Sequence, residues 1–127
     1  MAILIGNEVK QLASGVVIDS AAAAPYEVYT APATKKVIVT AIVLRCTAAS
    51  GITVGASAKV EINPAAGDIF TEEVLVDVLA VDDSWAFIAE ARSLVVPAGA
   101  RVDVTITNAA TGGTQTLSAD VLGYFVF

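Results

Sequence analysis

The sequence predicts an all-β protein, an antiparallel β-sandwich of about eight short strands arranged as a jelly roll with an N-terminal arm. Its apolar content, 56% of 127 residues, comes mostly from Ala and Val, and β-branched side chains favour the pleated surface of a strand. Short apolar or alternating runs follow one another, and most turns between them contain Gly, Pro or Asn. A chain of this length forms one core.

The clearest strand pattern lies in Ser93–Asn108. Leu94–Val96 is a short apolar run, and Pro97-Ala98-Gly99 has the composition of a turn. From Arg101 the residues alternate, which predicts a strand with one buried and one solvated face. The buried face would hold Val102, Val104 and Ile106, and the solvated face Arg101, Asp103, Thr105 and Thr107. A similar turn and strand at Thr30–Thr40 indicates two corresponding edges of a sandwich.

Further strands are predicted on both sides of this stretch. Lys36–Cys46 is apolar on both faces, so it should lie centrally in a sheet or under a subunit interface. Asp68–Leu79 is ambiguous between helix and strand, and its β-branched residues favour strand. Asn108–Gly113 is interpreted as a hairpin loop. The other predicted strands are Tyr26–Thr30, Ile52–Val54 with Ala58–Ile62, Trp85–Ala89 and Thr116–Phe127.

Residues 1–24 differ from the rest and are predicted to form an arm, with residues 25–127 as the sandwich domain. Asn7 could cap a short helix, with Gly15 just past its end. Ile3, Leu4 and Ile5 are too apolar to remain in water, so we expect them to pack on an adjacent chain. The alternative is that residues 1–24 provide a first strand of the same sandwich.

Composition and charge exclude several classes of function. The net charge is −6, and basic residues do not cluster beyond Lys35-Lys36, so neither nucleic acid nor an anionic membrane surface is an expected partner. No apolar run is long enough to span a bilayer, and the N-terminal residues lack the basic region of a secretory signal. We therefore expect synthesis in a cytoplasm. The single cysteine, Cys46, is expected to be a small buried apolar residue.

Motifs for catalysis or for a cofactor are missing from the sequence. The chain has no histidine, which excludes Ser-His-Asp and Cys-His catalysis, and it has no phosphate-binding glycine motif. Carboxylates gather at Asp68, Glu72, Glu73, Asp77, Asp82 and Asp83. They lack calcium-loop spacing, so solvated strand edges are favoured over a metal site or a carboxylate-pair hydrolase. Trp85 and Phe87 are interpreted as core residues rather than as a sugar-stacking platform. The prediction is a protein without enzymatic activity, cofactor or metal.

Low charge and the final strand point to self-association. Only 16% of residues are charged, which favours other subunits covering part of the surface over a surface of Ala, Thr and Ser side chains. In the final strand, Val121, Phe125 and Phe127 alternate with Leu122, Tyr124 and Val126, so both faces are apolar. One face would fill the core, and the other would meet a neighbour in a homotrimer. The alternative is that both faces are internal, one of them under a loop. The predicted subunit-interface residues are Leu122, Tyr124, Val126 and Phe127.

Three segments in residues 25–127 resemble small structural proteins of tailed bacteriophages. Val28–Val37 is similar to their YT-x-PAGK opening, Leu94–Val102 to their aGd-x-v turn, and Ala119–Phe127 to their V-x-GY terminal strand. Thr34 and Ala100 depart from the common Gly and Asp.

The resemblance implies a jelly roll, often trimeric, that decorates or cements a phage head or sits in a tail or fibre tip. The expected function is therefore that of a capsid decoration (cement) protein on the virion surface. Its expected partner is the major capsid protein, which Ile3, Leu4 and Ile5 would contact if they do not contact a sister subunit. The alternative is a tail-fibre or receptor-binding head domain that recognises a host glycan.

Overall fold

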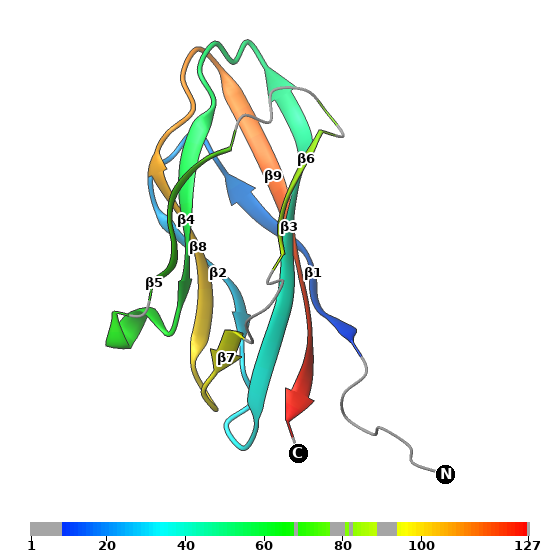
Figure 1. The fold of residues 1–127 in the computed structure, drawn as a ribbon. Coiled ribbons are helices and arrows are strands. Elements are labelled where there is room, and N and C mark those ends of the chain that lie inside the picture. The colour runs from blue at the N-terminus through cyan, green and yellow to red at the C-terminus, as the bar shows by residue number, and fades with distance from the viewer. Residues whose placement is uncertain (1–8, 68, 77–80, 82, 89–93, 127) are drawn as a thin grey trace.

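The computed structural model describes residues 9–67, 69–76, 81, 83–88 and 94–126. These residues form nine β-strands and one short 3-10 helix, Pro64–Ala66 (Figure 1). The strands are β1 (Lys10–Asp19), β2 (Pro25–Thr30), β3 (Lys36–Ser50), β4 (Ala56–Ile62), β5 (Ile69–Val76), β6 (Ser84–Ile88), β7 (Leu94–Val96), β8 (Arg101–Asn108) and β9 (Thr114–Val126). The all-β prediction is confirmed, and the ambiguous segment contains strand β5. No helix in the described ranges is long and apolar enough to cross a bilayer.

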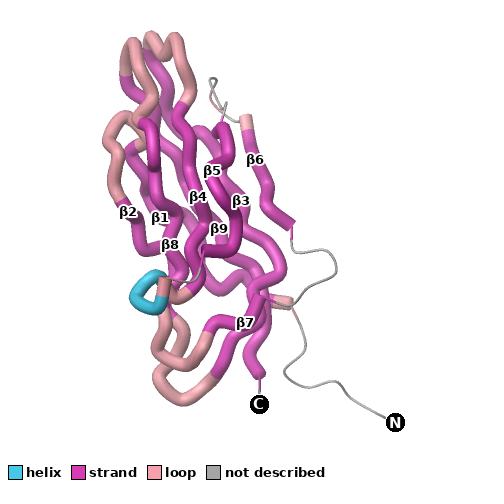
Figure 2. Tube along the Cα trace, turned by 60° about the vertical axis from the view of Figure 1, so that its left-hand side comes forward, coloured by secondary structure: helices cyan, strands magenta, loops and turns pink. Residues whose placement is uncertain are grey.

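The strands pair into two antiparallel sheets that face each other, and this confirms the predicted sandwich (Figures 1 and 2). The first sheet has the order β1-β9-β3-β6, with β7 also paired to β3, and the second has the order β2-β8-β4-β5. The pairing is nested along the chain: β1 lies beside β9, β2 beside β8, β3 beside β6 and β4 beside β5. Asn108–Gly113 is therefore not a hairpin loop, because it connects β8 in the second sheet to β9 in the first.

The core lies between the sheets and is built mainly from Val, Ile and Ala. Strands β3 and β9 pair along nearly their whole lengths. The predicted strand Lys36–Cys46 lies within β3, which occupies a central position in its sheet as expected. Val37, Ile42 and Leu44 of β3 are fully buried, and Cys46 is buried with them. Burial of each Val, Ile or Leu side chain stabilises the fold by about 1.5–3 kcal/mol.

Strand β9 contains one position that requires glycine. Gly123 is buried opposite Val39 of β3, next to the register shift between Val39 and Ala41. A Cβ atom at Gly123 would overlap the carbonyl oxygen of Ile38 and lie 2.9 Å from Cδ1 of Leu12. The glycine of the Gly-Tyr pair near the end of the sequence therefore allows β9 to approach the β3 backbone.

Residues 10–19 form a strand of the sandwich, which was the alternative interpretation of this segment. β1 pairs antiparallel with β9, and its Ile18 is fully buried in the core. This corrects the expected arm for these residues, and it excludes the short helix expected before Gly15. The sequence offered no partner for them because β9 lies about a hundred residues further along the chain. Ile3, Leu4, Ile5 and Asn7 lie outside the described residues, so an arm over residues 1–8 stays a prediction.

Strand β8 confirms the predicted alternation with one exception. Val102, Val104 and Ile106 are buried between the sheets. Asp103, expected on a solvated face, is only 3% exposed. It lies on the outer face of the second sheet, but β2 and β4 flank it and place Glu27 and Glu61 opposite it. Polar neighbours on both sides, rather than the core, cover this carboxylate.

Candidate interaction surfaces

The outer face of the first sheet carries a continuous apolar surface. Cross-strand partners point to the same side of a sheet, so the register brings Tyr124 of β9, Ile38 of β3 and Val95 of β7 into one row. Neighbouring rows pair Leu122 with Ala41 and Val126 with Lys36. We call Ile38, Ala41, Val43, Val95, Leu122, Tyr124 and Val126 the apolar face.

Side chains on the apolar face differ in exposure. Val95 is 47% and Val126 is 39% exposed, whereas Ile38, in the middle of the row, is 8% exposed. Leu122 and Tyr124 are half-buried. Each exposed valine leaves apolar area in contact with water, and removal of that area from water is favourable by about 25 cal/mol per Å². The surface is thus suited to contact with another apolar surface.

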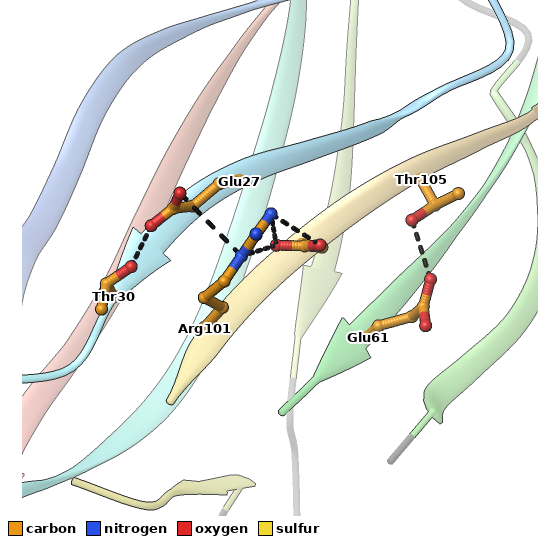
Figure 3. A network of polar contacts seen from close by, with 6 residues as sticks. Glu27, Thr30, Glu61, Arg101 and Thr105 are labelled. Carbon is orange, nitrogen blue, oxygen red and sulfur yellow. Dashed lines mark hydrogen bonds and ion pairs between the residues drawn. The ribbon is translucent and has the colours of Figure 1, made fainter. Parts of the chain in front are cut away.

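The outer face of the second sheet has the opposite character, because its polar groups bind one another (Figure 3). Arg101 donates from Nε and Nη2 to the two carboxylate oxygens of Asp103, both at 3.1 Å. The same guanidinium lies 3.9 Å from Oε2 of Glu27, whose other oxygen accepts a hydrogen bond from Thr30. On the other side, Glu61 accepts from the Thr105 hydroxyl at 2.8 Å and pairs with Lys59 at 3.6 Å.

Burial raises the pKa of the Asp103 carboxylate, which lies in the middle of this network. Desolvation raises the pKa of Asp103 above its ordinary value of 3.8, and the nearby Glu61 and Glu27 act in the same direction. The charge and hydrogen bonds of Arg101 oppose this rise. The network thus satisfies its own polar groups within one sheet, and its charges suit contact with water.

A third feature is a pair of cation–π contacts near the end of β9. The ammonium groups of Lys10 and Lys35 lie 5.8 and 5.6 Å from the ring centroid of Phe125. Phe125 packs against the core from this end. Cation–π contacts of this kind contribute about 0.5–1 kcal/mol each at exposed sites. They link the end of β9 to the start of β1 and to the β2–β3 connection.

The structure places three of the four predicted interface residues together. Leu122, Tyr124 and Val126 share the apolar face, whereas Phe127 and the N-terminal residues Ile3, Leu4 and Ile5 lie outside the described residues. The sequence interpretation missed Ile38 and Val95 as neighbours of Tyr124. The signal for Val95 was the run Leu94–Val96, which is apolar at every position although only its two ends are buried.

The remaining candidate residues are only partly described. Asp83 is exposed, whereas the side chains of the other five clustered carboxylates lie outside the described part, as do those of Trp85 and Phe87. The backbone of β6 sets Trp85 opposite Leu44 and Phe87 opposite Ile42. Among the described residues, no group of three or more Cys, Asp or Glu side chains is placed to hold a metal ion.

Comparison with known proteins gives a likeness of fold. No protein-family model matches the chain, and no curated protein matches it. A solved structure described as "Cyanophage Pam1 capsid asymmetric unit" contains a chain with a similar fold, at a TM-score of 0.64 and 15% sequence identity. The match covers 98% of this chain and 89% of that chain. The two chains therefore share an architecture along nearly their whole lengths.

Proposed function

We propose that this chain is a structural protein of a tailed-phage virion, of the capsid decoration (cement) type. The observation that carries the proposal is the shared fold with a chain of a cyanophage capsid asymmetric unit, over 98% of this chain. The three segments that resemble tailed-phage structural proteins support it independently, because they come from the sequence alone. In this role the protein binds the major capsid protein on the outer surface of the head and stabilises the shell.

The strand order supports the jelly-roll part of the proposal. Two facing sheets with nested pairing, from β1 with β9 inward to β4 with β5, correspond to a long hairpin wrapped into a sandwich. In such a barrel-like sandwich the loops gather at the two ends. One end carries the β2–β3 connection, the β7–β8 connection and the end of β9 (Figure 1).

We further propose that the protein acts as a homotrimer, with Leu122, Tyr124, Val126 and Phe127 at the subunit contact. The apolar face supports this, because it offers apolar area for a contact between subunits. A virion protein that gains affinity by multivalent contact needs such a stable oligomer. The contrast between the two outer faces also supports it. The second sheet presents an ion-pair network suited to solvent, so the first sheet is the better candidate for contact between subunits.

The direct test adds purified protein to phage heads assembled without it. We expect saturable binding in co-sedimentation and heads that withstand higher temperature before they release DNA. Absence of binding to heads, together with binding to host cells or purified host glycan, would contradict the decoration role and favour the receptor-binding alternative. Tails purified from the same particles serve as the control for location.

A further inference from the structure

We propose that the apolar face is covered by Ile3, Leu4 and Ile5 of a neighbouring copy, so that each subunit donates one segment and accepts another. This deepens the oligomer proposed above and rests on it. The donor is a named part of this chain that lies outside the described residues. The acceptor is the described surface around Tyr124, Ile38 and Val95.

The acceptor has the width and chemistry for a short apolar segment. Neighbouring strands lie about 4.8 Å apart, so the row from Tyr124 through Ile38 to Val95 spans roughly 10 Å. Val95, at one end of this row, is 47% exposed, and Tyr124, at the other end, is half-buried. Charged partners begin only at the borders of the face, where Lys36 lies opposite Val126 and Asp120 lies opposite Val43.

The register of β1 shows where the donor segment leaves the sheet. Gln11 lies opposite Leu122 and Lys10 opposite Gly123, so the chain runs toward the end of β9 as it is followed back to the N-terminus. The pairing ends there, because Val9 already lies outside the strand and is 54% exposed. In the proposed assembly, Ile3, Leu4 and Ile5 extend from this point to the neighbouring copy.

The segment is long enough to leave its own subunit and reach another. Ile3 lies seven positions before Lys10, and an extended chain covers at most about 3.3–3.6 Å per position, so the segment can extend about 23–25 Å. Donor and acceptor are different surfaces of one chain, so the contact is head-to-tail. Such contacts close into a ring when the rotation between copies permits, and a ring of three would satisfy every donor and acceptor.

The first experiment is disulfide cross-linking between co-expressed full-length chains, one with Leu4→Cys and one with Val95→Cys. Buried Cys46 does not compete with the introduced thiols, because it is fully shielded from solvent. The matched control replaces Val95→Cys by Val17→Cys, which is more exposed, at 68%, and lies opposite Ser118 in the same sheet. We expect a cross-linked heterodimer with Val95→Cys and none with Val17→Cys.

Other outcomes of the cross-linking overturn the proposal. Equal cross-linking to both positions, or to neither in a chain that is oligomeric by light scattering, would show that the segment does not lie on this face. An intrachain disulfide in the Leu4→Cys/Val95→Cys double variant, without interchain product, would show that it covers its own subunit. In each case the oligomer and the decoration role would stand, because light scattering and head binding test them separately.

A double-mutant cycle gives a second, independent measurement. Leu4→Ser and Val95→Ser each remove apolar area from the same proposed interface, so each should raise the subunit dissociation constant about tenfold or more. The double variant should dissociate little more readily than either single variant, because the first change already abolishes the interaction that the second would remove. Fully additive effects on dissociation would contradict the contact between these two residues.

Discussion

Replacement of Tyr124 by Ala should weaken the oligomer more than it unfolds the subunit. Full burial of a large apolar side chain stabilises by about 1.5–3 kcal/mol, and Tyr124 is already half-buried beside Ile38 within its own subunit. About half of that energy, roughly 0.8–1.5 kcal/mol per copy, is therefore left for the interface between subunits. This corresponds to a dissociation constant about four- to twelvefold higher for each interface that carries the substitution.

Tyr29→Ala provides the matched control. Tyr29 is also half-buried and packs against the core, but it belongs to β2 in the second sheet. We expect Tyr29→Ala to lower the free energy of unfolding and to leave subunit dissociation unchanged. Dissociation would be followed by sedimentation velocity across a dilution series, and unfolding by circular dichroism. If Tyr124→Ala melted early yet dissociated at the same concentration as the parent, the interface assignment would be wrong.

Three further predictions concern the fold itself. Gly123→Ala should lower the free energy of unfolding by about 3 kcal/mol or more, because the added Cβ meets the backbone of β3. Chemical denaturation measures this change. A decrease of less than about 0.5 kcal/mol would contradict the close approach of β9 to β3. Burial raises the pKa of Asp103, so the folded state holds more protons than the unfolded state just above pH 3.8. The parent should therefore lose stability relative to Asp103→Asn as pH rises through that window, and the opposite slope would contradict the shift. Removal of residues 1–8 should leave a folded sandwich. Removal of residues 1–24 should unfold it, because that deletion also removes β1 and the buried Ile18. Equal melting temperatures for the two deletion variants would refute this.

Much of the fold could be predicted from local pattern. The alternation in Arg101–Asn108 and the two-sided apolar run in Lys36–Cys46 follow from which faces of a strand are buried, and both strands are present. The lengths of β3 and β9 could not be predicted in the same way. Their polar ends, such as Thr47 and Gln115, belong to strands only because the partner strand continues beside them.

Pairing between distant segments explains the two main differences. Residues 10–19 have no partner nearby in the sequence, so the segment suggested an arm, and only β9 makes it a strand. Asp103 fits the polar side of an alternating strand, but its burial depends on Glu27 and Glu61 from two other strands. The apolar face has the same origin. Tyr124 was predicted from its own strand, whereas Ile38 and Val95 join it only through the register.

The mass of the protein in solution tests the proposed assembly most directly. Light scattering coupled to size-exclusion chromatography, with native mass spectrometry as a second method, would measure it at micromolar concentration. We expect three times the chain mass of 12.9 kDa, with a shift toward the single-chain mass for Tyr124→Ala. A mass of one chain for the unmodified protein at that concentration would contradict the homotrimer and, with it, the role of the apolar face as a subunit interface.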